Sequence, residues 1–293
     1  KLAVPAGIGM LFTTLYNVVD VFFAGLIGTE AQAGLAISFQ AFFIFITFGF
    51  GLSAAMAALV GNATGAKDLY KASMIARKGM GFGLLVSMLL IIAASWIGPL
   101  LINLISTEGA YRDMGTQYFN ILVIAIPSFV MAFGINGLLQ SQGDTISMQH
   151  AQIGAFFANV GLNPLLVFGI PGLWNGMGFD GIAVATVISQ TGVVIYVGKQ
   201  LFKSELMIGW QLANLTPNLV TAKSITGQML PTTLTMVVMM TSGFIVQYYL
   251  KSFGTPAVAA YGVALRVEQL FLLPVFGLTG ALLPIAAQNF GAD

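Results

Sequence analysis

The chain has 293 residues, of which 57% are hydrophobic and only 7% are charged, whereas about 25% of the residues of a typical soluble domain are charged. No soluble surface can be built from this composition, so we expect an integral membrane protein. The net charge of +1 gives no electrostatic reason to expect a nucleic-acid partner, and the absence of cysteine excludes disulfides and thiolate metal sites in this chain.

Eight apolar segments are long enough to cross a bilayer, since a membrane-spanning helix needs about 20 predominantly apolar residues. Divided at charged or Gly/Pro-rich breaks, they run over 3–27, 32–61, 73–105, 116–141, 150–170, 179–202, 224–251 and 256–289. None shows the strict alternation typical of a membrane β-barrel strand. The sequence therefore predicts an all-α, polytopic membrane bundle.

Basic residues gather in the connections on one side of the predicted bundle. They follow the second segment and lie between the sixth and seventh: Lys67, Lys71, Arg77, Lys78, Lys199, Lys203 and Lys223. The opposite connections carry only Arg112 and Lys251. Because basic loops stay in the cytoplasm, we expect a multi-pass protein of the cell inner (plasma) membrane with a cytoplasmic N-terminus.

The start of the chain recurs near its end. A shift of 226 residues places Pro5 on Pro231, "GTEAQAG" at Gly28 on "GTPAVAA" at Gly254, and "FGLSAA" at Phe50 on "FGLTGA" at Phe276. An even number of segments precedes the second copy, so the copies are predicted to be parallel repeats related by an axis along the membrane normal.

This repeat predicts a division into two lobes. Residues 1–205 would form an N-lobe of six helices, 206–223 a cytoplasmic linker, and 224–293 the first two helices of a second lobe. Completing the second copy gives a parent chain of twelve helices, so we expect the sequence to be a fragment of it.

Asp20 lies deep inside the first segment, in "LYNVVDVFFAG". An ionised Asp near the bilayer centre costs about 2.5–3.5 kcal/mol on insertion scales and should face a cavity or a partner. Val246 occupies the equivalent position of the second copy, so the helix itself does not require an acid there. The alternative is a structural carboxylate that caps a neighbouring helix or holds a fixed water.

Asn159 and Asn163 in "FFANVGLNPLLVFG" are candidate partners of Asp20 because they share one helical face. Their carbonyls could ligate a cation, and their amides could hold a carboxylate. Pro164 frees a backbone carbonyl nearby as a further oxygen donor. The alternative is that both asparagines are interhelical hydrogen-bonding residues.

A substrate cavity is expected to involve residues of the first, seventh and eighth segments: Tyr16, Asn17, Met236, Met240 and Glu268. Methionine and aromatic walls suit varied apolar ligands, although such a stripe also fits packing or a lipid-facing surface. Arg266 and Glu268 are two residues apart and do not form a local ion pair. Either each points into a cavity between the lobes, or the helix begins later than 256.

No enzyme motif appears: the sequence has no phosphate-binding loop, no nucleophile elbow and no metalloprotease helix. The single histidine, His150, does not make a histidine-based metal site. We therefore expect a protein that is not an enzyme and has no cofactor.

The stretches "PAGIGMLFTTLYNVVDVFFAGLIGTEAQAGLA", "LLQSQGDTISMQ", "FFANVGLNPLLVFG" and "IAVATVISQ" resemble the multidrug and toxic compound extrusion (MATE) transporters. The resemblance extends over essentially the whole chain. It implies twelve helices in two lobes and export of cationic or amphipathic compounds by alternating access, in exchange for H⁺ or Na⁺. It also implies that the partners are small-molecule substrates and the lipid bilayer, and a monomer is expected.

The resemblance assigns residues to the coupling site. Asp20 matches the first-helix acid that takes up the cation, Pro5 the proline at which that helix bends, Asn159 a polar residue beside the acid, and Thr186 a hydroxyl of the sixth helix. Asn163 departs from the pattern, because many members have a second aspartate there. Asp20, Asn159 and Asn163 would be metal ligands only if Na⁺ is the coupling ion, and with one acid we expect weaker Na⁺ binding.

Two other functions are considered. A lipid-linked oligosaccharide flippase of the same broad superfamily would share the helices and the repeat, but its central cavity should be more cationic than Arg266 alone makes it. A non-transporting membrane scaffold would have no use for Asp20.

Overall fold

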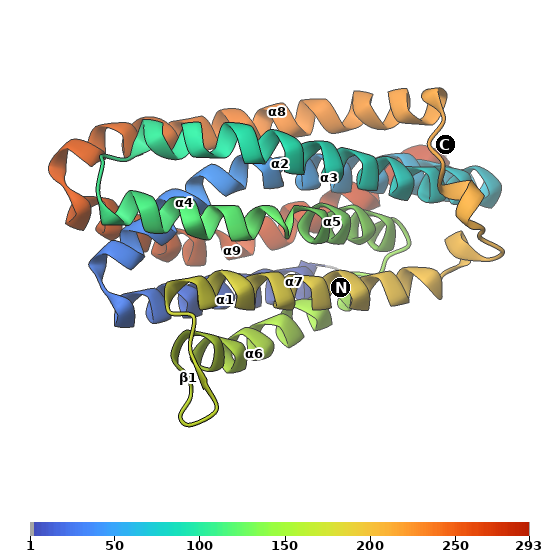
Figure 1. Cartoon of the computed structure of the whole chain (residues 1–293). Helices are drawn as coiled ribbons and strands as arrows, with labels where there is room; N and C mark the ends of the chain where they lie inside the picture. Colours follow the sequence, from blue (N-terminus) through green and yellow to red (C-terminus); the bar gives the residue numbers. More distant parts are fainter. Residues whose placement is uncertain (1–2, 293) are drawn as a thin grey trace.

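The computed structural model describes residues 3–292, except for the side chains of 3–7, 10, 266, 269, 270, 273–281, 284 and 292. Its long elements are helices that lie side by side in one elongated bundle (Figure 1). They are α1 (Ala3–Ile27), α2 (Thr29–Gly65), α3 (Leu69–Ile105), α4 (Ala110–Val123), α5 (Ile126–Ser141), α6 (Ile146–Phe168), α7 (Phe179–Phe202), α8 (Leu219–Leu250) and α9 (Thr255–Ala292).

Short elements connect some of these helices. The strands β1 (Gly169–Ile170) and β2 (Trp174–Asn175) form a small antiparallel hairpin between α6 and α7. Gly169 and Gly172 have φ angles of 76° and 79°, which glycine adopts without steric cost. Three 3₁₀ turns occupy Glu205–Met207, Leu212–Leu215 and Lys251–Phe253.

The all-α, polytopic membrane fold is confirmed. Within the described residues, five helices are long and apolar enough to cross a membrane, and the bent pair α4–α5 makes a sixth. The predicted segments 3–27 and 179–202 agree with α1 and α7 at both ends. Helix α8 begins at Leu219, inside the stretch 206–223 that was predicted as the linker between lobes.

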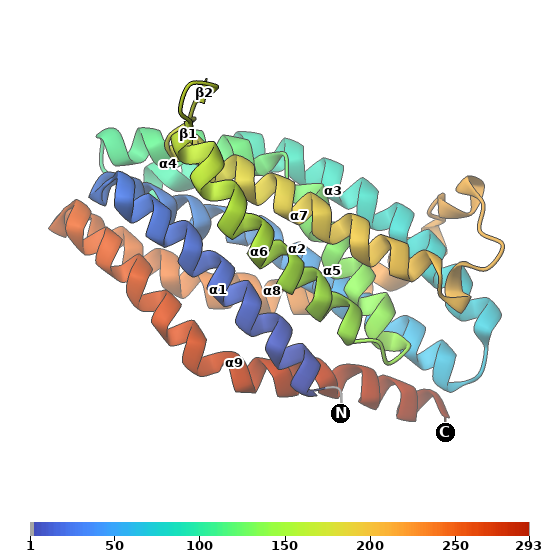
Figure 2. The same cartoon turned by 90° about the horizontal axis from the view of Figure 1, so that it is seen from below.

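Helix α2 is the centre of the bundle. It packs against α1, α3, α4, α5, α8 and α9, and 56% of its most apolar stretch is buried, against 11% for α8. Figure 2, a view turned by 90°, shows α9 running along the same side of the bundle as α1. The small residues of α2 let its neighbours approach closely, which is how helices associate in a membrane.

The predicted segment 116–141 corresponds to the helix pair α4 and α5, which together pass as one bent span. The chain bends by 54° between α4 and α5, because Pro127 has no N–H to donate to Val123 and its ring clashes with that carbonyl. The N–H groups of Ile124 and Ala125 instead donate to the carbonyls of Ile121 and Leu122, at 3.3 and 2.8 Å.

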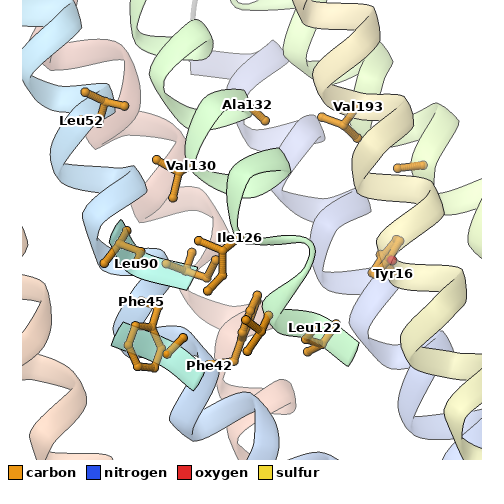
Figure 3. Close-up of a cluster of buried hydrophobic side chains, with 14 of the residues drawn as sticks. Tyr16, Phe42, Phe45, Leu52, Leu90, Leu122, Ile126, Val130, Ala132 and Val193 are labelled. Carbon is orange, nitrogen blue, oxygen red and sulfur yellow. The ribbon is translucent and has the colours of Figure 1, made fainter. Parts of the chain in front are cut away.

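Aromatic side chains fill the space around this bend. The Phe42 ring of α2 makes edge contacts with Phe119 of α4 and Phe129 of α5, with centroids 6.3 and 5.5 Å apart. Figure 3 shows Phe42 beside Leu122 and Ile126, the residues on either side of the break. The bend is therefore packed into the core.

Helices α2 and α9 cross through equivalent positions of the repeat. A Cβ added at Gly65 would overlap the carbonyl of Gln288, and a Cβ added at Gly291 would overlap the carbonyl of Asn62. The shift of 226 residues relates Gly65 to Gly291 and Asn62 to Gln288. Each contact is thus the image of the other, as a two-fold axis between the two copies requires.

The close crossing of α2 and α9 predicts that one methyl group added at Gly65 destabilises the protein. Gly65→Ala should lower the stability by about 1–3 kcal/mol, the usual cost of overpacking, because the Gln288 carbonyl occupies the added volume. Gly154→Ala in α6 is the matched control, since nothing lies within 4 Å of its added Cβ. Thermal unfolding of the purified variants measures both, and a Gly65→Ala protein as stable as the control would contradict the crossing.

Candidate cation site

Asp20 is completely buried where α1 meets α6 and α7. Asn159 and Asn163, one turn apart on α6, each place the amide nitrogen 3.0 Å from the same carboxylate oxygen of Asp20. Thr186 of α7 donates its hydroxyl to the other carboxylate oxygen at 3.2 Å. The structure thus brings together the four residues predicted for the coupling site.

Both asparagines point their amide N–H groups toward the carboxylate of Asp20. Asn163 shares its amide nitrogen between Asp20 and the side-chain oxygen of Asn159, which is 2.9 Å away. The sequence left two roles open for these side chains, which were to hold a carboxylate or to ligate a cation. In this arrangement they hold the carboxylate. Three neutral donors compensate the charge of an acid that water does not reach, since hydrogen bonds to an ionised group are the strong ones.

Three other polar atoms lie buried in this region and make no well-aligned hydrogen bond to a described residue. They are the side-chain oxygen of Asn163 and the hydroxyls of Tyr16 and Ser189. The Tyr16 hydroxyl lies close to Asn159, Thr186 and Ser189, and Figure 3 shows it where α1 faces α7. Leaving such an atom unpaired costs about 1–3 kcal/mol, which is typical of a site that takes a ligand.

The chemistry of these groups favours a hard cation or a proton. All of the atoms that can accept are oxygens, which suit H⁺ and alkali cations rather than soft metals. No group of three or more His, Cys, Asp or Glu side chains occurs in the described part of the chain. Ser189 was not among the predicted residues, although its position one turn after Thr186 places both on one face of α7.

The methionines predicted for a substrate cavity lie elsewhere. Met236 and Met240 are half-buried on α8, and the backbone carbonyl of Met240 accepts a hydrogen bond from Gln40 of α2 at 3.4 Å. Asn17 is half-buried on α1, next to the buried Tyr16. The structure therefore brings Tyr16 to the acid, while the backbone of Met240 contacts α2.

Glu268 is exposed on α9. Because α9 begins at Thr255, the alternative of a helix that starts after Arg266 and Glu268 is wrong. Pro5 lies in α1, but its side chain and that of Arg266 are outside the described residues.

A bundle of apolar helices with crossing repeats and a buried, neutrally compensated acid defines a polytopic membrane protein built like a transporter. The chain belongs to the MatE family, whose sequence model matches residues 5–165 and 231–293. The two matched stretches begin at the equivalent prolines of the repeat.

Named relatives agree with this assignment. The chain is 23% identical over 295 residues to the multidrug export protein MepA of Staphylococcus saprophyticus, covering 99% of this chain and 64% of that protein. It is 20% identical to MepA of Staphylococcus aureus, covering 98% and 63%. The chain thus spans a little under two thirds of the length of these relatives.

Solved structures have the same fold. The outward-facing conformation of a multidrug resistance MATE family transporter of the MOP superfamily superposes with a TM-score of 0.87 at 23% identity, covering 99% of this chain and 64% of that one. The inward-facing conformation of a multidrug resistance MATE family transporter superposes with a TM-score of 0.79 at 23% identity, covering 96% and 64%.

The site predicts that Thr186→Val destabilises the protein. Losing a hydrogen bond to a buried charged group should cost about 1.5–3 kcal/mol, and the cost should shrink when Asp20→Asn removes the charge. Thr191→Val is the control, because that hydroxyl donates to the Val187 carbonyl of its own helix at 2.7 Å.

Thermal unfolding of the single and double variants forms a double-mutant cycle. Additive effects of Thr186→Val and Asp20→Asn would show that the two side chains do not interact.

Proposed function

We propose that the chain is part of a secondary active antiporter, not an enzyme, that exports cationic or amphipathic organic compounds in exchange for H⁺ or Na⁺, with Asp20 as the cation site. The observation that carries this proposal is the buried carboxylate beside three oxygens that make no well-aligned hydrogen bond to a described residue. The relatives are named multidrug export proteins, which supports the substrate class.

Cation binding would change the balance of hydrogen bonds around Asp20. With the acid ionised, Asn159, Asn163 and Thr186 all donate to it. A proton or Na⁺ on the carboxylate needs acceptors instead, and the side-chain oxygen of Asn163 has no partner. A half-turn of that amide exchanges its donor for its acceptor, so the site can adapt to both states without moving a helix.

The single carboxylate limits the charge that the site can compensate. A pair of acids can share one cation between them, whereas Asp20 has amides and hydroxyls beside it. A bound Na⁺ would keep its full positive charge, and one acid with neutral oxygens would bind it weakly. A bound proton would instead neutralise the acid. We therefore favour H⁺ as the better ligand and propose Asp20, Asn159 and Asn163 as Na⁺ ligands only if sodium drives the cycle.

The described conformation fits an outward-facing state. At the end of the bundle that carries the C-terminus, Gln288 of α9 donates to the Ser141 carbonyl of α5 at 2.7 Å, and α2 crosses α9 without a gap. The fold match is higher for an outward-facing structure than for an inward-facing one. We propose that this basic end faces the cytoplasm of the plasma membrane, with the two lobes closed there.

Export then follows from the different affinities of the two lobe arrangements for the cation. Occupation of Asp20 in the outward-facing state would neutralise a buried charge that only neutral donors compensate, and would let α1 bend near Pro5. That bend would displace the substrate from a cavity near Tyr16 and Asn17, with Met236, Met240 and the exposed Glu268 contributed by the second copy. We propose that one chain completes this cycle as a monomer.

The decisive prediction concerns Asp20→Asn in the complete protein in proteoliposomes. Efflux of a fluorescent lipophilic cation should respond to an imposed pH gradient, or to a Na⁺ gradient, in the parent protein. Asp20→Asn should lose this response because the amide cannot take up the cation. Glu30→Gln, which removes the same charge from an exposed position, should keep it. If Asp20→Asn transports like the parent under both gradients, Asp20 is structural.

A further inference from the structure

A second feature of the bundle is an apolar hollow far from Asp20. It has a volume of about 320 Å³ and is lined by residues of α3, α5 and α7. Helix α5 packs between the other two, as the order of these helices in Figure 1 shows. The lining of the hollow comes from Met80 of α3, Met131 and Ile135 of α5, and Ile195, Gly198 and Lys199 of α7. We name it the lateral groove.

Helix α7 presents one continuous face to the lateral groove. Ile195, Gly198, Lys199 and Phe202 all line it, and their spacing of three, four and seven residues is that of one helical stripe. Gly198 makes the hollow, because an added Cβ there would meet nothing within 4 Å. The lining is therefore apolar except for the Lys199 ammonium.

The lateral groove leads to the basic end of the bundle. Lys203 lies one turn after Lys199, so the two ammonium groups continue the same stripe, and both residues are exposed. Among the described residues, the one ion pair joins Arg112 to Glu108, at the other end. Both lysines thus carry charge that the described side chains do not compensate.

The surroundings of the lysines resemble a membrane interface. Trp210 packs against Phe202 in a tilted arrangement, with the ring centroids 4.9 Å apart. Arg77 of α3 fixes the turn before Trp210 by donating to the carbonyls of Leu206 and Ile208, at 3.1 and 2.6 Å. Aromatic and basic side chains concentrate at the level of the lipid headgroups, where each lysine attracts anionic lipid.

We propose that the lateral groove binds an anionic glycerophospholipid from the membrane leaflet at the basic end. One acyl chain lies against Met80, Met131 and Ile135, and the phosphate meets Lys199 and Lys203. A small anion would leave the apolar lining uncovered. A zwitterionic lipid brings a choline ammonium with its phosphate, so it would leave the two lysines without a net counter-charge. This site is independent of the proposed transport function, since it requires only that the protein lies in a membrane.

Trp210 supplies the reporter for a test in the complete protein, reconstituted in nanodiscs. Subtracting the emission of Trp210→Phe from that of the parent isolates this residue from all other tryptophans. Brominated phosphatidylglycerol should quench it at a lower mole fraction than brominated phosphatidylcholine, by about five-fold for each lysine, and high salt should reduce the difference.

Two variant pairs separate the parts of the site. The double variant Lys199→Gln/Lys203→Gln should lose the preference for phosphatidylglycerol. The control double variant Lys67→Gln/Lys71→Gln removes equal charge at the same end and should keep this preference. Gly198→Leu should fill the lateral groove and weaken quenching by both lipids. Gly192→Leu, also in open space on α7, should not.

Three results would overturn the proposal. Equal quenching by the two lipids in the parent protein would show that the lateral groove does not select an anionic headgroup. A lysine-dependent preference that Gly198→Leu leaves intact would show that the lysines attract headgroups without a chain in the groove. Equal effects of the two lysine pairs would show a general surface attraction.

Discussion

A fully buried carboxylate is the constraint on which the N-terminal half of this bundle depends. Asp20 is fully buried, and its charge is compensated by side chains of α6 and α7 that donate from two directions. The relative positions of α1, α6 and α7 are therefore fixed by hydrogen-bond distances near 3 Å as well as by packing. A change in the charge of Asp20 alters the energy of all three helices at once, which is what a coupling site needs.

Helix α2 packs on α1, which carries Asp20, and connects it to α3, α4, α5, α8 and α9. Helices α8 and α9 both pack directly on α2, and the crossing of Gly65 and Gly291 repeats the same contact twice. The described part of the second copy thus packs on the first without touching the acid's hydrogen bonds. Asp20 and its donors thus all lie in the first copy, while the contacts between the copies combine close glycine crossings with the hydrogen bonds of Gln288 and Gln40.

The sequence predicted the features that depend on local spacing. The bounds of α1 and α7 follow from unbroken apolar runs, the repeat from a constant offset, and the pairing of Asn159 with Asn163 from one turn of helix. Features that depend on contacts between distant segments were not predictable. These are the orientation of the asparagine amides, the place of Ser189 and the hollow at Gly198. Pro127 itself was a local signal for the break between α4 and α5, but the apolar run on both sides of it indicated a single span.

The central claim, that the coupling cation binds to the Asp20 carboxylate, is tested most directly by infrared difference spectroscopy of the complete protein with and without the cation. We predict a carboxyl band that appears when H⁺ binds, or a shifted carboxylate band when Na⁺ binds. This signal should be absent from Asp20→Asn and retained in Glu30→Gln. A difference spectrum that is unchanged in Asp20→Asn would contradict the account, because the cation would then bind to another group.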